Sequence, residues 1–341
     1  MKVGIVGFGK MGMLHGALLN KIDGMEVAAI TDSSRVIINA IRSLLPNIGH
    51  FMSYEKMIDH AGIDAVVITT PTFSHVPIAL KAIKKGLHFF MEKPLGNTLS
   101  NAFVLEKALK GRPLVSMVGF HMRYIPTFVK GKELLTRNAI GNVREISSEI
   151  YVSDIFSPQK GWRYDPSVSG GGIVIDYTIH LLDILHWYFG EVTTVKAKVK
   201  SVYSKLVEDE VKAEFGFRNG LSASIISSWS IPGYRLPYCA LKITGDNGSM
   251  TVNDHSVTVT DKNGSIAQRH TVADLYSGYY FDIAGCCYSL QMEAFARAII
   301  SKKHSSNILD AVYAQRLVDA IYSSSSRGSA VAFAGGPNEA S

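Results

Sequence analysis

The sequence predicts a two-part fold, in which an α/β domain with a doubly wound parallel sheet precedes an α+β domain built on a large, mainly antiparallel sheet. The first 120 residues alternate short apolar strands with helical patterns, as parallel sheets require. Beyond about residue 140, β-branched runs are separated by turn signals such as Arg218-Asn219-Gly220 and Asp246-Asn247-Gly248. A chain of 341 residues also exceeds one ordinary core. We therefore expect domains at 1–120 and 121–341.

The composition is that of a soluble globular protein. Hydrophobic residues make up 47% but form no uncharged run long enough for a membrane span, and Met1-Lys2 leads directly into a strand, so we expect a cytoplasmic protein without a membrane segment. The three cysteines have no metal or disulfide spacing, which favours thiols in a reducing compartment and no metal site. The net charge of +6 comes from scattered basic residues, which argues against nucleic-acid binding.

A glycine-rich turn follows the first strand, expected at 2–6. Gly7-Phe8-Gly9-Lys10-Met11-Gly12 has the GxGxxG spacing and opens a helical pattern that runs to about residue 20. In this context Gly7 permits a tight turn, Gly9 lets the backbone approach a pyrophosphate, and Gly12 allows close packing of helix on strand. The pattern predicts a Rossmann domain that binds a dinucleotide.

A carboxylate ends the next expected strand, 26–31. Asp32 lies twenty residues after Gly12, where an acidic side chain accepts hydrogen bonds from the adenosine ribose and repels a 2′-phosphate. NAD is therefore favoured, with Ser33 beside it. Arg35 is near enough in sequence to pair with a 2′-phosphate, so NADP stays a second option. The structural alternative for Asp32 is an N-cap of the helical run 33–45.

Two later strand ends are expected to border the same cofactor, because ligands bind at the carboxyl ends of parallel strands. The strand 65–69 ends at Thr69-Thr70-Pro71, with His75 as either a cofactor contact or a simple helix-start residue. The strand 87–91 ends at Glu92-Lys93-Pro94. A lysine at such a strand end can polarise a substrate oxygen; the structural alternative is an exposed lysine before a turn.

The stretch 170–183 carries the titratable groups of the second half. After Gly170-Gly171-Gly172, Asp176 and His180 are four residues apart, and helical geometry of about 100° per residue puts them with Asp183 in one stripe roughly 60° wide. A carboxylate one turn from an imidazole can hold its tautomer and stabilise the imidazolium during general base catalysis. By spacing alone, a surface or capping contact is the more common outcome.

Recognition residues are expected in the loop 153–169, which contains Trp162 and Arg163. An aromatic face packs on a sugar ring while an arginine binds its hydroxyls, although such a tryptophan can equally be a packing anchor. Tyr279, in an aromatic cluster before a helix at 287–301, is a further candidate for the rim of the pocket. Helices are also expected at 125–135 and 308–323, the last ending at the serine run 323–326. Strands are expected at 143–152, 192–202, 209–217, 221–229, 238–244 and 249–252.

Several separated motifs together resemble the glucose-fructose oxidoreductase and inositol dehydrogenase family, called Gfo/Idh/MocA. In order they are Gly7-x-Gly9-x-x-Gly12, Thr70-Pro71 with His75, Glu92-Lys93-Pro94, Arg123-Tyr124-x-Pro126, Ile140-Gly141-x-Val143, Trp162-Arg163 and Gly170-Gly171-Gly172-x-x-x-Asp176-x-x-x-His180. The resemblance covers residues 1 to about 300. One departure is Thr178, since family members usually have glycine two positions before the histidine.

The resemblance implies an NAD(P)-dependent dehydrogenase of a sugar, cyclitol or related polyol. It carries the family's catalytic lysine, aspartate and histidine onto Lys93, Asp176 and His180, and it puts Arg123 among the substrate contacts. It also implies a homodimer or homotetramer formed through the C-terminal sheet. Two other classes stay open from the residues: a regulator that binds NAD(H) without turnover, and a reductase of another unsaturated substrate.

Overall fold

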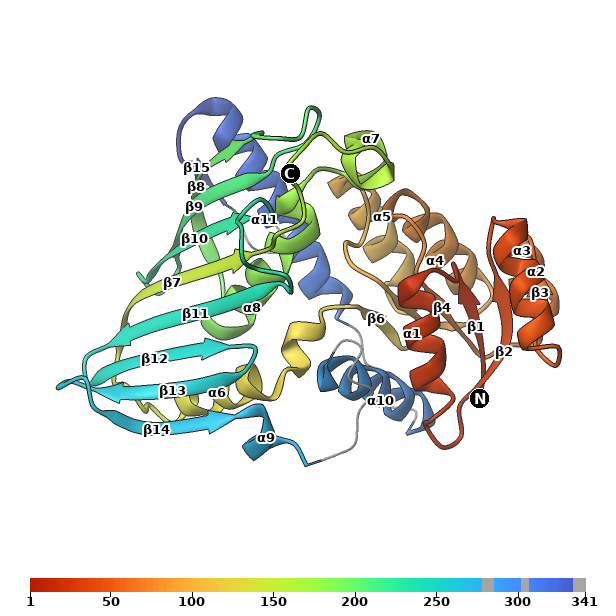
Figure 1. The fold of residues 1–341 in the computed structure, drawn as a ribbon, viewed down its shortest axis with the longest axis horizontal. Coiled ribbons are helices and arrows are strands. Elements are labelled where there is room, and N and C mark those ends of the chain that lie inside the picture. The colour runs from red at the N-terminus through yellow and green to blue at the C-terminus, as the bar shows by residue number, and fades with distance from the viewer. Residues whose placement is uncertain (278–284, 302–306, 334–341) are drawn as a thin grey trace. The chain divides into compact units, whose positions relative to one another are not determined.

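The computed structural model describes residues 1–277, 285–301 and 307–333, and the chain in it divides into two compact units (Figure 1). One comprises Met1–Phe120 with Phe281–Val312, and the other His121–Tyr280 with Tyr313–Ser341. This division groups Phe281–Val312 with the first unit, whereas the sequence analysis expected residues 121–341 to form the second domain. Helix α10 (Cys286–Ile300) packs on α1 (Lys10–Leu19) of the first unit. The ring of its buried Phe295 contacts that of Phe90, which lies in the fifth strand of the same unit.

Among the described residues, the first unit has a six-stranded sheet in the order β3-β2-β1-β4-β5-β6, with every neighbouring pair parallel. This is the doubly wound order of dinucleotide-binding domains, as predicted. The strands are β1 (Lys2–Val6), β2 (Glu26–Thr31), β3 (Gly49–Phe51), β4 (Ala65–Ile68), β5 (His88–Met91) and β6 (Ser116–Val118). All four residues of β4 are buried, as expected for a central parallel strand. The sequence analysis missed β3, because three residues are too few to show a period.

The helices of this unit follow the predicted alternation. They are α1, α2 (Arg35–Leu44), α3 (Tyr54–His60), α4 (His75–Lys84, after the short η1, Thr72–Ser74), α5 (Leu99–Leu109) and α10. Helix α2 begins two residues later than expected, since Ser34 is its N-cap and its hydroxyl accepts a hydrogen bond from the amide of Ile37.

The second unit is built on a sheet of nine strands, counted over the described residues, in the order β14-β13-β12-β11-β7-β10-β9-β8-β15. Its strands are β7 (Val143–Tyr151), β8 (Val192–Lys200), β9 (Glu210–Phe217), β10 (Ser222–Ser228), β11 (Tyr238–Gly245), β12 (Gly248–Asn253), β13 (Ser256–Asp261), β14 (Ile266–Thr271) and β15 (Val331–Ala332). Only β7 and β10 pair in parallel. The predicted mainly antiparallel sheet is confirmed, and β13, β14 and β15 extend it.

Helices contact one face of this sheet and leave the other exposed (Figure 1). Helix α6 (Pro126–Thr136) packs on β12 and β13, and α8 (Ile179–Phe189) on β7. Burial alternates along β9 and β10, so their inward residues form the core. The shorter elements are η2 (His121–Tyr124), η3 (Trp162–Tyr164), α7 (Pro166–Ser169), η4 (Val174–Thr178) and α9 (Val272–Leu275).

The last helix is longer than predicted. The serine run 323–326 was expected to end it, but α11 (Ile308–Arg327) continues through all four serines. The hydroxyls of Ser324 and Ser325 accept hydrogen bonds from the amides of Ala197 and Val199, at 2.9 and 3.0 Å. These amides lie on β8 beyond its short pairing with β15, so the serines satisfy an otherwise open sheet edge.

One described segment, Pro166–Phe189, is long and apolar enough to cross a membrane by length and composition. Its most apolar window is 78% buried inside the structure, where it packs against other elements of the protein. We interpret it as a core helix.

Candidate active site

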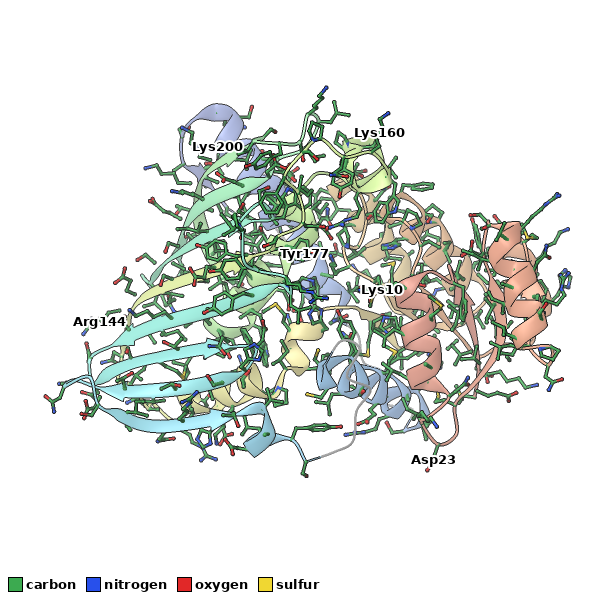
Figure 2. All side chains as sticks on the ribbon, in the orientation of Figure 1. Lys10, Asp23, Arg144, Lys160, Tyr177 and Lys200 are labelled. Atoms are coloured by element: carbon green, nitrogen blue, oxygen red, sulfur yellow. The ribbon has the colours of Figure 1, made fainter. Side chains whose placement is uncertain are left out.

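The glycine-rich turn between β1 and α1 has the geometry that a dinucleotide requires. Gly7 has a φ of +87°, and a Cβ on Gly12 would lie 2.1 Å from the carbonyl oxygen of Gly7, so neither position accepts a side chain. Gly9 is the N-cap of α1 and has open space around its Cα. No side chain caps this helix and its first turn holds no acidic residue, so the N-terminal amides can receive a phosphate. Lys10 begins the helix and is exposed there (Figure 2). Phe8 lies within the turn, and Met11 is the second residue of the helix.

Asp32 is tied to this turn. Its Oδ2 accepts a hydrogen bond from the amide of Phe8 and its Oδ1 from the amide of Ser34, both at 2.8 Å. The alternative that Asp32 caps α2 is wrong, because Ser34 does so. Each carboxylate oxygen keeps a lone pair, so Asp32 can still accept hydrogen bonds from ribose hydroxyls. Ser33 and Arg35 are exposed next to it.

The end of β4 supports the same turn. The hydroxyl of Thr69 donates toward the carbonyl oxygens of Gly7 and Val6, at 2.5 and 3.2 Å, so this side chain holds the glycine turn in place. Thr70 and Pro71 are half-buried, and the hydroxyl of Ser74 donates to that of Thr70 at 2.7 Å. The group that we expected to contact a cofactor directly is thus partly a support for the glycine turn.

His75 is not placed as a cofactor contact. Its side chain is only 1% exposed, and its two ring nitrogens lie 2.8 Å from main-chain carbonyl oxygens, Nδ1 from that of Pro94 and Nε2 from that of Thr70. Burial lowers the pKa of His75, against the effect of both carbonyls and of Glu92. The ring therefore joins the loops that follow β4 and β5.

Lys93 is half-buried directly after β5, between Glu92 and a proline joined by a cis peptide bond. The carboxylate of Glu92 pairs with His15 of α1, with 2.7 Å between Oε1 and Nε2. The sequence analysis missed His15, because its partner lies 77 residues away and neither residue carries a local signal.

In the second unit, the last of the three glycines, Gly172, packs against Glu208. A Cβ on Gly172 would lie 2.2 Å from the carbonyl oxygen of Glu208, which only glycine avoids. The side-chain Oε1 of Glu208 accepts hydrogen bonds from the amides of Gly172 and Val174 and from the hydroxyl of Tyr322, at 2.9, 3.0 and 2.8 Å. This buried carboxyl therefore fixes the start of the segment that carries Asp176.

That segment is not the regular α-helix that the spacing argument assumed. Residues 174–178 form a π-helical turn, in which the amide of Ile179 bonds to the carbonyl of Val174, and α8 starts at Ile179. With i to i+5 bonding each residue turns by less than 100°, so the predicted 60° stripe does not apply across this turn. Thr178, the departure from the family pattern, is fully buried, and its hydroxyl donates to the carbonyl of Ile173 at 3.1 Å.

Asp176 is half-buried in this turn and pairs with Arg163. The Nε and Nη2 atoms of Arg163 lie 3.1 and 2.7 Å from Oδ2 of Asp176, and Nη1 lies 3.1 Å from Oδ2 of Asp154. Arg163 was expected to bind substrate, but its guanidinium is engaged by two carboxylates of its own chain. Figure 2 labels the neighbouring Tyr177, whose pKa is raised to about 12 by burial and by Asp176.

His180 is 4% exposed in the first turn of α8, and its ring meets that of His121 edge to face, with 4.6 Å between centroids. His121 belongs to η2, and no sequence signal pointed to it. The same η2 is joined to α8 by a bidentate pair, in which Arg123 donates from Nε and Nη2 to the two oxygens of Asp183 at 2.7 and 2.6 Å. Arg123 and the 1% exposed Asp183 therefore hold together the two elements, η2 and α8, that carry His121 and His180.

Two predicted substrate contacts remain. Trp162 is 45% exposed in η3, so its ring is not a packing anchor and is accessible to a ligand. Tyr279 lies outside the described residues.

Comparison with known proteins assigns both halves of the chain. The family described as "Oxidoreductase family, NAD-binding Rossmann fold" matches residues 1–120, and the "GFO/IDH/MocA C-terminal domain" matches residues 128–251. Oxidoreductase P35 of Formosa agariphila is 34% identical over 224 residues, which cover 63% of this chain and 68% of the relative. Myo-inositol 2-dehydrogenase of Thermotoga maritima is 27% identical over 291 residues, or 79% and 81% of the two chains.

A solved structure has the same fold over almost the whole length. The levoglucosan dehydrogenase complex with NADH and levoglucosan superposes with a TM-score of 0.86, covering 98% of this chain and 99% of that one, at 23% identity. The glycine turn, Asp32 and the two-unit architecture agree with these matches, and the chain is an oxidoreductase that belongs to the Gfo/Idh/MocA family, with an NAD-binding Rossmann domain.

Proposed function

We propose that the protein is an NAD-dependent dehydrogenase that oxidises a secondary hydroxyl of a sugar, cyclitol or related polyol. The observation that carries this proposal is the segment 172–183. On it His180 is buried in the first turn of α8, while Asp176 is anchored by Arg163 in the preceding π-helical turn. A regulator that only binds the nucleotide does not need an anchored carboxylate and a histidine in adjacent helical turns. The named activities of the inositol and levoglucosan relatives support the substrate class.

The proposed roles follow from the chemistry of each side chain. His180 takes the proton of the substrate hydroxyl, and Asp176 provides negative charge that stabilises the resulting imidazolium. The Lys93 ammonium polarises the substrate oxygen. When bound, NAD supplies the acceptor for the hydride.

NAD is proposed over NADP because of Asp32. Its carboxylate is held by the amides of Phe8 and Ser34, so it cannot easily turn away from a 2′-phosphate. Arg35 is exposed at the start of α2. Competition of NADH and NADPH for the protein, followed by cofactor fluorescence, tests this preference, and tighter binding of NADPH would contradict it.

The activity is tested with a panel of sugars, cyclitols and sugar phosphates, with NAD⁺ and NADP⁺ in parallel, by the absorbance of reduced cofactor. Turnover of a polyol supports the proposal. For the substrate found, His180→Ala should lower kcat by roughly 10² to 10⁴-fold with NADH affinity unchanged. Tight NADH binding without turnover of any panel member would instead indicate a regulator, and turnover limited to imine or conjugated substrates would indicate the other reductase class.

We also propose a cytoplasmic homodimer or homotetramer assembled through the exposed face of the large sheet. Tyr151 and Tyr238 are register partners on this face, and Tyr234 packs between them, with ring centroids 5.3 and 5.7 Å away. Ile226 is 40% exposed on the same face of β10. Such an apolar and aromatic patch suits association with a second copy. Ile226→Lys should reduce the mass measured by light scattering, and an unchanged mass would exclude this surface.

A further inference from the structure

Lys93 is flanked on both sides by residues that a buried histidine holds. Before it, Oε1 of Glu92 lies 2.7 Å from Nε2 of His15. After it, the carbonyl oxygen of Pro94 lies 2.8 Å from Nδ1 of His75. The two histidines come from different helices, α1 and α4, and are 0% and 1% exposed.

The contact between His15 and Glu92 is confined by its surroundings. The His15 ring packs edge-on against Phe90 of β5, with 4.9 Å between centroids. The other oxygen of Glu92 faces Gly119, where an added Cβ would lie 2.9 Å from Oε2, so the carboxylate fits between His15 and the main chain. A histidine side chain has only two rotatable bonds, so a buried ring holds its partner in one position more firmly than a flexible side chain does.

We propose that His15 and His75 are positioning residues that fix the place of the Lys93 amine, one through Glu92 and the other through Pro94. The relevance of this to catalysis rests on the proposed function, but the positioning itself does not. A neutral ring has one N–H, and the proposal assigns it to Nδ1 as the donor to the Pro94 carbonyl, while Nε2 lies 2.8 Å from the carbonyl oxygen of Thr70. His15 links the helix of the glycine turn to the strand end before Lys93.

The geometry predicts which substitutions keep each contact. The amide nitrogen of glutamine stands near the position of histidine Nε2, and that of asparagine near histidine Nδ1. His15 uses Nε2, so His15→Gln keeps the donor toward Glu92 and His15→Asn loses it. His75 uses Nδ1 toward Pro94, so His75→Asn keeps the link to the Lys93 loop, while His75→Gln loses it.

The test measures the chemical reactivity of the Lys93 amine, and this measurement does not require catalytic turnover. The full-length wild type and the four variants are pulsed with trace acetic anhydride without added cofactor, and acetylation of Lys93 is measured by mass spectrometry relative to the exposed Lys198 of β8. We expect His15→Asn and His75→Gln to change this ratio by about threefold or more, because lysine proton affinity and access respond to small displacements. His15→Gln and His75→Asn should keep the wild-type ratio. Should His15→Asn not fold, His15→Leu fills the same buried position without a donor toward Glu92 and should change the ratio as well.

Equal ratios in all variants, or changes in the two retaining variants as large as in the two others, would overturn the proposal. For any substrate that the wild type oxidises, the same two non-retaining variants should lose kcat, by about 10-fold or more, with KM for NAD⁺ little changed. A changed Lys93 ratio in a protein that oxidises no polyol would refute the proposed function and leave the positioning role intact.

Discussion

Arg163 donates two hydrogen bonds to a single oxygen of Asp176, from Nε at 3.1 Å and from Nη2 at 2.7 Å. Its third nitrogen lies 3.1 Å from Asp154. Burial alone would lower the pKa of Arg163, but the two aspartates outweigh it and raise that pKa above its usual value. Asp176 is thereby oriented by an arginine that stays charged at any working pH.

Removing this arginine should reduce turnover more than stability. Arg163→Leu is expected to lower kcat/KM by about 10²-fold, because a displaced Asp176 carboxylate no longer stabilises the imidazolium of His180. Arg163→Lys keeps the charge but not the planar fork, so it should recover only part of the rate. The matched control is Arg144→Leu, which breaks an exposed arginine pair with Asp246 in the same unit. Steady-state kinetics measures these changes. Equal losses of kcat/KM in Arg163→Leu and Arg144→Leu would contradict the role of Arg163 in orienting Asp176.

The pair of Arg123 and Asp183 should act on stability. Asp183 is 1% exposed, so Arg123→Leu leaves its buried carboxylate without the arginine that neutralises it. This substitution is expected to lower the free energy of unfolding by about 3 to 5 kcal/mol. The double variant Arg123→Leu/Asp183→Leu removes both charges and should recover most of this loss. Urea unfolding of the four proteins in the double-mutant cycle measures the coupling. Additive losses would show that the two side chains do not act as a pair.

The fold was predictable from the sequence because its signals are local. The apolar run of β4, the GxGxxG spacing and the carboxylate after β2 each lie within one element and its turn. Strand β14 was missed because none of its residues is buried and they show no alternation, whereas β13 alternates buried Val257 and Val259 with polar residues and could have been predicted. The serine run of α11 was misjudged because its hydroxyls find partners on β8, about 127 residues away.

The site was predictable only in part, for a related reason. The spacing of Asp176 and His180 suggested a shared helix face, but it could not reveal a π-helical turn that depends on Glu208, 36 residues from Gly172. The partners of Glu92 and Asp183 likewise lie 77 and 60 residues away. Residue types therefore identified the candidate site residues. Which of these residues hold other site residues in place is determined by pairs that are distant in sequence, and only the structure shows those pairs.

Glu208 offers a direct test of how the π-helical turn is held. Glu208→Ala removes the acceptor for two buried amides and the Tyr322 hydroxyl, and should cost about 3 kcal/mol or more in the free energy of unfolding. Glu208→Gln keeps an acceptor oxygen of the same reach. Since burial raises the pKa of Glu208, a neutral amide avoids part of the cost of the buried charge, so this variant should be close to wild type. Thermal and urea unfolding compare the two variants, and similar losses would mean that charge and not hydrogen bonding matters.

Asp254 should make the protein less stable as pH rises. Burial raises its pKa from 3.8 to about 6, although its Oδ2 accepts a hydrogen bond from the amide of Cys239 at 3.2 Å. A carboxyl whose pKa is higher in the folded state binds its proton more tightly there, so its stabilising contribution is complete below the unfolded pKa and is lost as pH rises through about 6. Because the side chain is half-buried, we expect a loss of about 1 to 2 kcal/mol across that window, below the figure for a fully shielded group.

Asp254→Asn keeps an acceptor for Cys239 and removes the titration. Its free energy of unfolding, measured in urea between pH values of about 4 and 7, should fall less steeply than that of the wild type and exceed it at the upper end. Asp246→Asn is the control of opposite sign, because the hydrogen bond from Arg144 lowers the pKa of Asp246 and makes its contribution grow as pH rises. If Asp254→Asn and the wild type showed parallel pH profiles, the Asp254 carboxyl would not be the source of the pH dependence, and the charge would have to be solvated in the folded protein.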